Sequence, residues 1–164
     1  MRHALKFSLL ICALAAGLAS AKSSDREQPM DIDADNMDAL LSDDSVSTLT
    51  GNVRIRQGSL EVDADKADIH RKAGEIDRIV LTGGPARLAQ VSDTGEPMTA
   101  TAREIVYTMS SEIMVLTGNV VVEQPRGNLR GETVKYDINT GRLDGGGDGK
   151  RVSMRILPKT TPKN

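Results

Sequence analysis

The sequence contains almost no cysteine and very few aromatic residues. Its one cysteine, Cys12, and its one phenylalanine, Phe7, both lie near the N-terminus, which leaves Tyr107 and Tyr136 as the aromatic residues of the rest of the chain. A single cysteine cannot form a disulfide within the chain or a cysteine-based metal site. With no tryptophan, the core must be built from slender or flexible side chains, namely valine, isoleucine, leucine, methionine and alanine.

Residues 1–21 have the features of a secretory signal peptide. The basic residues Arg2 and Lys6 precede an apolar stretch of 12 residues, Phe7–Leu18, and small residues follow at Ala19–Ala21. This order is typical of a cleavable signal, and we expect cleavage after Ala21. The apolar stretch is much shorter than the roughly 20 residues that span a bilayer, so we do not expect a permanent anchor.

The 143 residues that follow have the length of one domain and a small negative charge. They carry 19 basic and 23 acidic residues, a net charge of −4, and no basic stripe with interleaved aromatic residues. This balance argues against a nucleic-acid partner. We expect one folded domain over residues 22–158 and a flexible polar tail over residues 159–164.

Three copies of Leu-Thr-Gly divide the chain at intervals of 32 and 35 residues. They begin at Leu49, Leu81 and Leu116 and read LTGNVRIRQ, LTGGPARLAQ and LTGNVVVEQ. A repeat of this length indicates one supersecondary unit used several times. The glycine pairs and Gly-Asn pairs tolerate positive φ, so we expect each to mark a turn or a bulge between strands.

Apolar and polar residues alternate around these copies, as in Asn52–Gln57 and Arg151–Ile156. Alternation with a period of two predicts strands with one apolar face. The sequence therefore predicts an all-β fold of many short antiparallel strands, with turns every 8 to 12 residues or so. A β-jelly roll or a sandwich would hide the apolar faces.

The alternation also predicts which side chains point inward. The inward residues are Met30, Ile32, Leu49, Val53, Ile55, Leu60, Val62, Ile69, Ile79, Leu81, Leu88, Met98, Ile105, Tyr107, Met114, Leu116, Val120, Val122, Leu129, Val134, Tyr136, Ile138, Leu143, Val152, Met154 and Ile156. The residues alone leave open whether these side chains fill a solid core or leave a gap for acyl chains.

Three clusters resemble reactive or metal-binding sites but lack essential residues. Asp31–Asn36 begins like a calcium loop, but Asn36 and Ser42 stand where the EF-hand needs glycine and glutamate. Asp144–Gly149 resembles a calcium-binding repeat but occurs once. His70 is the one histidine after the signal segment, and a single histidine cannot assemble a triad or a zinc site. We expect a non-enzymatic protein with no metal and no cofactor.

Several short motifs occur in the order and at the spacing of one known family. They are QPMDIDAD (28–35), LTGNV (49–53), ADKA (64–67), GPA (84–86), GEP (95–97), VLTGN (115–119), GE (131–132) and GKRV (149–152). Each motif is weak alone, but the ordered set covers nearly all of the chain after the signal segment. With that segment, it resembles the OstA-like family of periplasmic lipopolysaccharide-transport proteins.

The resemblance implies a fold, a location and a function. Members of this family are OstA-like β-jelly rolls that enclose an apolar groove and reside in the periplasm. They bind lipopolysaccharide through its lipid A part and assemble head to tail. The resulting bridge joins LptC at the inner membrane to LptD at the outer membrane, and it needs no cofactor.

The resemblance and the alternation together imply particular site residues. The expected lipid-binding groove comprises Met30, Ile32, Val53, Ile55, Leu60, Val62, Leu88, Ile105, Tyr107, Met109, Leu116, Val120 and Val122. On this interpretation, Met30 and Ile32 also lie on the N-terminal edge strand that contacts LptC. Val152, Met154 and Ile156 lie on the C-terminal strand that contacts the next subunit or LptD.

Other functions fit parts of the same pattern. A structural or adhesive β-repeat protein with a solid core would share the repeats but bind no lipid. A protein like LptC would share the domain but keep its N-terminal segment as a membrane anchor. A periplasmic enzyme is the weakest alternative, because no catalytic set of residues is found.

Overall fold

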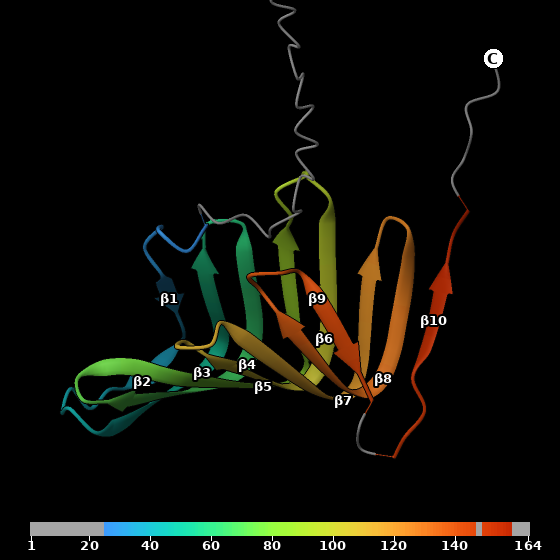
Figure 1. Cartoon of the computed structure of the whole chain (residues 1–164). Helices are drawn as coiled ribbons and strands as arrows, with labels where there is room; N and C mark the ends of the chain where they lie inside the picture. Colours follow the sequence, from blue (N-terminus) through green and yellow to red (C-terminus); the bar gives the residue numbers. More distant parts are fainter. Residues whose placement is uncertain (1–24, 147–148, 159–164) are drawn as a thin grey trace, which may run out of the picture.

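The computed structural model describes residues 25–146 and 149–158, which form one antiparallel β-sheet (Figure 1). Its strands are β1 (Asp31–Asp33), β2 (Asn36–Asp38), β3 (Ser45–Gln57), β4 (Leu60–Lys72), β5 (Glu75–Val91), β6 (Pro97–Thr108), β7 (Ile113–Gln124), β8 (Gly127–Asp137), β9 (Arg142–Gly145) and β10 (Ser153–Ile156). The order across the sheet is β1-β3-β4-β5-β6-β7-β8-β10, with β2 paired to β3 and β9 paired to β8. The all-β antiparallel prediction is confirmed.

The expected signal peptide and polar tail, residues 1–21 and 159–164, lie outside the described residues. Within the described ranges, no helix has both the length and the apolar character needed to cross a membrane.

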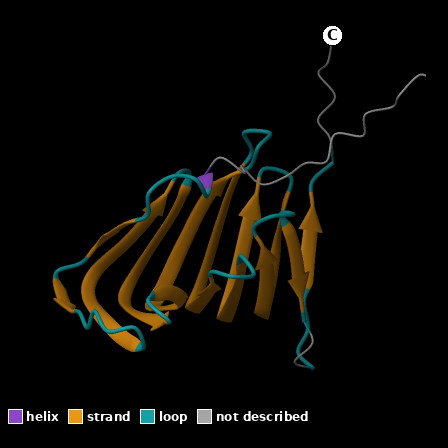
Figure 2. Cartoon of the chain, turned by 60° about the vertical axis from the view of Figure 1, so that its left-hand side comes forward, coloured by secondary structure: helices purple, strands orange, loops and turns teal. Residues whose placement is uncertain are grey.

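The long strands bend near their middle, where the pairing slips out of register. The shifts lie between Thr50 and Val53, Asp63 and Lys66, Thr82 and Ala86, Thr101 and Glu104, and Thr117 and Val120. Because the shifts fall side by side, they fold the single sheet into two leaves. Figure 1 shows the upright strand halves of one leaf above the other, and Figure 2 shows the strands as one continuous array from a second direction.

We call the two halves leaf A and leaf B. Leaf A comprises β2, β9 and the strand segments 45–50, 66–72, 75–82, 104–108, 113–117 and 133–137. Leaf B comprises β1, β10 and the segments 53–57, 60–63, 86–91, 97–101, 120–124 and 127–131. The two leaves take the place of the two packed sheets that the sequence suggested.

The Leu-Thr-Gly copies lie at these bends, inside strands rather than between them. Gly51 and Asn52 have φ values of 79° and 46°, and Gly118 and Asn119 have values of 88° and 51°. Such left-handed residues add one residue to a strand and bend it, and pairing resumes beyond the bulge. The strands β3–β8 therefore run for 11 to 17 residues, longer than the sequence suggested. Since the motif recurs in β3, β5 and β7, the repeat unit is a pair of strands.

Acidic side chains from neighbouring segments stabilise the bulges. The backbone N–H of Gly84 donates to Asp65 at 2.9 Å, and the Asn119 N–H donates to Glu132 at 3.4 Å. The Asn52 side chain donates to Asp35 at 2.8 Å. The first two bonds satisfy backbone N–H groups that the interrupted pairing leaves free, and the third ties the Asn52 side chain to the neighbouring segment.

The inward side chains of both leaves form one buried apolar cluster, as the alternation predicts. Three predicted inward residues are exceptions: Val152, Met154 and Ile156 are exposed. Met154 and Ile156 belong to the last strand of leaf B, which has no further strand beside it. Val152 precedes that strand. Its side chain lies beside Gly131 and Gly145, and an added Cβ atom at either glycine would contact it.

Candidate functional site

Inward residues that lie directly opposite one another form a row across each leaf. The row of leaf B is Ile32, Ile55, Val62, Leu88, Ala100, Val122, Leu129 and Met154. The row of leaf A is Met37, Leu49, Ala67, Leu81, Ile105, Leu116 and Val134. Opposite residues share a face of the sheet, so the two rows give an apolar lining that crosses the whole molecule.

All thirteen residues expected in the groove belong to this lining or touch it. Ten are buried in the cluster: Val53, Ile55, Leu60, Val62, Leu88, Ile105, Tyr107, Leu116, Val120 and Val122. Met30, Ile32 and Met109 are partly buried and pack against it. The structure therefore brings the predicted set together between the leaves.

The centre of this lining is closed. Leu88 from leaf B and Leu116 from leaf A help line a narrow inner cavity with no space for a water-sized sphere. Met98, Val122 and Tyr136 complete much of its wall. Because protein interiors are close-packed, a guest could enter here only if the two leaves moved apart.

The lining opens at the end formed by β9 and β10, which we call the trailing end. A cavity of ≈ 210 Å³ lies there, and its apolar wall includes Leu129, Leu143 and Met154. Met154 is 64% exposed and Ile156 is 74% exposed, although Met154 lies opposite the buried Leu129. Apolar surface thus continues onto the last strand, and Arg126 and Arg155 also line this cavity.

The opposite end, formed by β1 and β2, also leaves apolar surface exposed, and we call it the leading end. Met37 lies opposite the buried Leu49 and faces inward, yet it is 58% exposed. Met30 and Ile32, at the leaf B side of this end, are partly buried and pack against the core cluster. The apolar lining therefore reaches both ends of the sheet without a polar barrier in its rows.

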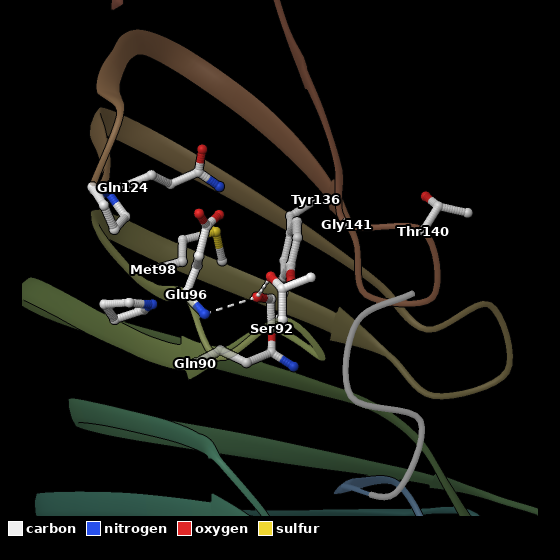
Figure 3. A pocket seen from close by; sticks show the side chains of 11 residues that line it. Gln90, Ser92, Glu96, Met98, Gln124, Tyr136, Thr140 and Gly141 are labelled. Carbon is white, nitrogen blue, oxygen red and sulfur yellow. Dashed lines mark hydrogen bonds between the residues drawn. The ribbon is translucent and has the colours of Figure 1, made fainter. Parts of the chain in front are cut away.

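A polar pocket of ≈ 200 Å³ lies along the open side, where hairpin turns of the two leaves face each other (Figure 3). We call it the rim pocket. Its polar lining includes Ser92 and Glu96 from the turn between β5 and β6, Gln124 from leaf B and Thr140 from the turn between β8 and β9. Of the residues that the structure describes, no lysine or arginine lines it. Tyr136 lines both this pocket and the inner cavity, so it stands at the boundary between polar rim and apolar interior.

One buried hydrogen bond joins the leaves at that boundary. The Tyr136 hydroxyl, from β8 in leaf A, donates to the side-chain oxygen of Gln90, from β5 in leaf B, at 2.8 Å. The two residues are 5% and 4% exposed. Burial raises the pKa of Tyr136 to about 12, because the phenolate would lose its hydration. Sequence analysis missed Gln90, although a polar residue two positions after Leu88 stands at an inward position.

A second link between the leaves crosses the open side near the N-terminus. The Ser59 hydroxyl donates to Asp25, and the Gln57 side chain donates to the Arg26 carbonyl at 3.3 Å, which holds this segment on leaf B. The Arg26 guanidinium forms an ion pair with Glu112, in the turn after β6 of leaf A. Burial, aided by the nearby Glu112 carboxylate, raises the pKa of Tyr107 beneath this link.

The aspartates of the calcium-loop-like segment and His70 lie on the outer surface, whereas the calcium-repeat-like segment Asp144–Gly149 includes residues 147–148, which lie outside the described residues. Asp31 and Asp33 are exposed on β1, and Asp33 accepts a hydrogen bond from Arg56 at 2.7 Å. His70 lies 3.4 Å from the Arg78 guanidinium. Among residues 25–146 and 149–158, no group of three or more histidine, cysteine, aspartate or glutamate residues could hold a metal ion.

Comparison with known proteins identifies the family. Residues 31–142 match the family model described as LptA/(LptD N-terminal domain) LPS transport protein. The chain belongs to this family. A relative from Escherichia coli K12, the lipopolysaccharide export system protein LptA, is 33% identical over 158 residues, which cover 94% of this chain and 85% of that protein. A Haemophilus influenzae protein of the same name is 33% identical over 154 residues, covering 92% of this chain and 89% of its own length.

A solved structure in this family has the same fold. The crystal structure of LptH, described as the LptA-homologous periplasmic component of the lipopolysaccharide transport device of Pseudomonas aeruginosa, aligns with a TM-score of 0.74. The alignment has 24% identity and covers 82% of this chain and 99% of that one. The resemblance to the OstA-like family is thus confirmed, and its description as a transport protein agrees with the expectation of a non-enzymatic function.

Proposed function

We propose that this protein carries lipopolysaccharide through the periplasm, with the acyl chains of lipid A held between the two leaves. The observation that carries the proposal is the apolar lining, which runs from Ile32 and Met37 at one end to Met154 at the other. A soluble protein gains nothing in stability from apolar side chains left exposed at both ends of its core. A lipid conduit needs those ends open.

The polarity of the open side suits an amphiphile. Apolar residues lie deep between the leaves, whereas hydroxyl, amide and carboxylate groups line the rim pocket. Acyl chains would lie inside and the sugar part of lipid A would face the rim. Burial is worth roughly 0.8 kcal/mol per CH₂, so a groove that buries each chain only in part retains the lipid while still allowing it to move onward.

We further propose that subunits assemble head to tail, with β10 and β9 of one copy beside β1 and β2 of the next. Alternating antiparallel pairing from β1 through β8 leaves β10 antiparallel to β1. A second copy in the same orientation would therefore extend the sheet with the same pairing. The edge strands are short, only three or four residues, and have one unpaired side each, as strand addition requires.

The same edges define the partners that we propose at the two ends of a bridge. The leading edge, with Met30 and Ile32, would contact LptC, and the trailing edge, with Met154 and Ile156, would contact LptD. Both partners would have to offer an edge strand of the same fold. Location in the periplasm follows from the expected signal peptide and its cleavage after Ala21, which determination of the N-terminus of the exported protein would check.

Displacement of a lipid probe tests lipid carriage. The exported protein is purified without detergent and loaded with a fluorescent acyl probe, and purified lipopolysaccharide is then titrated in. We expect lipopolysaccharide to displace the probe and the same molecule stripped of its acyl chains to leave it bound. A protein that binds neither probe nor lipopolysaccharide would support the solid-core β-repeat alternative.

A further inference from the structure

The two edge strands of leaf B carry opposite charges on their outward faces. On β1, Asp31 and Asp33 flank the inward Ile32, and on β10, Arg155 lies between the inward Met154 and Ile156. Asp33 already has Arg56 as a partner at 2.7 Å. The side chains of Asp31 and Arg155 have no hydrogen-bond or ion-pair partner within residues 25–146 and 149–158, and both residues are exposed.

From this arrangement we propose that Arg155 of one copy pairs with Asp31 of the next copy, and that this pair sets the direction of assembly. The inference rests on the proposed head-to-tail contact and adds its register and its polarity. Ile32 and Met154 belong to the same row of leaf B. If that row continues into a second copy, Met154 of one copy lies opposite Ile32 of the next. Antiparallel pairing then places Arg155 of the first copy opposite Asp31 of the second.

Alternative registers are less favourable. A slip by one residue would turn the apolar side chains of one strand to the outer face, which the inward pattern disfavours. A slip by two residues, with Ile156 opposite Ile32, would place Arg155 opposite Asp33, whose carboxylate is already bound to Arg56. Side chains of opposite charge that lie directly opposite each other stabilise a strand pair by roughly 0.2–1 kcal/mol. The register with Arg155 opposite Asp31 gains this stabilisation from a new ion pair, and the slipped register does not.

The same charges oppose assembly in the wrong direction. Two leading edges paired about Ile32 would place Asp31 opposite Asp33 twice. Two trailing edges, with Met154 opposite Ile156, would place Arg155 opposite Arg155. Like charges directly opposite each other destabilise a strand pair. Dimers that join two leading edges or two trailing edges are therefore disfavoured. The favoured contact is head to tail, which does not close on itself and can add further copies.

Charge reversal tests the inference in the full exported chain. We would measure self-association by sedimentation velocity for Asp31→Arg, for Arg155→Asp and for the double variant. Each single reversal should raise the dissociation constant about tenfold by replacing attraction with repulsion, and the double variant should return to within about threefold of the original. An equimolar mixture of the two single variants should also associate, because each then offers the charge that the other requires.

Arg130→Asp is the matched control, since Arg130 faces outward on β8 one strand inside the same edge, opposite Ser153. At physiological salt its effect should stay within about twofold, because the Debye length is then about 8 Å. Unchanged melting temperatures show that the variants fold.

Single variants that associate normally, or a mixture that stays dissociated, would overturn the charge pairing while leaving head-to-tail assembly intact. An original chain that is monomeric at every concentration would overturn both.

Discussion

Tyr136 and Gln90 form a buried polar contact between the leaves at the edge of the apolar interior. Their hydrogen bond satisfies two buried polar groups, at 2.8 Å. Leaving either partner alone in the interior would cost roughly 1–3 kcal/mol. The pair therefore holds the leaves together beside the rim pocket, and under the proposed function an entering lipid would have to part or bypass it.

The buried phenol gives the protein a measurable dependence on alkaline pH. The folded pKa of Tyr136, about 12, lies above its ordinary value of 10.0. As the pH rises above 10, the Tyr136 hydroxyl loses its proton in the unfolded chain before it does so in the folded chain, which favours the unfolded state. The free energy of unfolding should therefore fall by about 2 kcal/mol between pH 10 and about 12. Tyr136→Phe should lack this part of the fall.

Ultraviolet absorbance of tyrosinate gives the direct measurement, because the chain contains only two tyrosines and no tryptophan. Titration of the folded protein and of Tyr136→Phe assigns the transition of Tyr136. A midpoint near 10 for Tyr136 in the folded protein would contradict the burial of its hydroxyl.

Substitution of Leu88 tests whether the two leaves pack closely against each other. It is fully buried in the row of leaf B and lines the closed inner cavity. Leu88→Ala should lower the free energy of unfolding by about 2–5 kcal/mol. Met154→Ala removes a side chain from the same row where it is exposed, and it should cost less than about 1 kcal/mol. Denaturant unfolding measures both, and equal losses would show that the leaves are already apart in solution.

Sequence alternation was sufficient to predict most inward residues but not their exposure. Ile32, Leu88 and Met154 have the same local pattern, and only their position in the sheet makes the first partly buried, the second buried and the third exposed. Gln90 escaped the prediction because its partner Tyr136 is 46 residues away and on the other leaf. Such a contact exists only once the sheet has folded back on itself.

At the scale of elements, the bulges determine the architecture. They bend β3–β8 at matching places, and so one sheet provides two facing leaves. Gly51 and Gly118 allow the bend because their backbones are left-handed, with φ values of 79° and 88°. A straight sheet of the same strands would expose its whole apolar face.

Alanine at Gly51 should weaken the bend. A Cβ atom there would lie 2.5 Å from a carboxylate oxygen of Asp35, in addition to the strain of a left-handed alanine. We expect a loss of about 2 kcal/mol or more in the free energy of unfolding. Gly95→Ala is the control, because Gly95 has a similar φ of 80° with nothing within 4 Å of the added Cβ, and it should cost about 1 kcal/mol. Equal costs at the two positions would contradict the tight contact at the bulge.

Strand identity could be predicted from the sequence better than strand length. The Leu-Thr-Gly copies correctly indicated repeated strands with glycine-dependent irregularities. Gly51-Asn52 and Gly118-Asn119 are equally compatible with a turn and with a bulge, because both use left-handed residues. Pairing across neighbouring strands decides between them, and that information is not local.

At the scale of the whole molecule, an apolar lining open at both ends is what distinguishes a bridge from a closed carrier. The exposed inward residues Met37, Met154 and Ile156 lie at the two ends of the sheet, where another copy would cover them. Stacked copies would then join their linings into one path. Sequence motifs pointed to this family, but the continuity of the rows from β1 to β10 required the three-dimensional register.

The central claim is that acyl chains of lipopolysaccharide lie between the leaves. Site-specific photo-cross-linking in cells tests it most directly. Photoreactive residues are placed at the inward positions Ile55, Leu60 and Tyr107. The controls are the outward positions Arg54, beside Ile55 on β3, and Glu61, beside Leu60 on β4. The account predicts lipopolysaccharide adducts at the inward positions and none at the outward ones. Adducts of equal strength on both faces, or none at the inward positions in a folded protein, would contradict it.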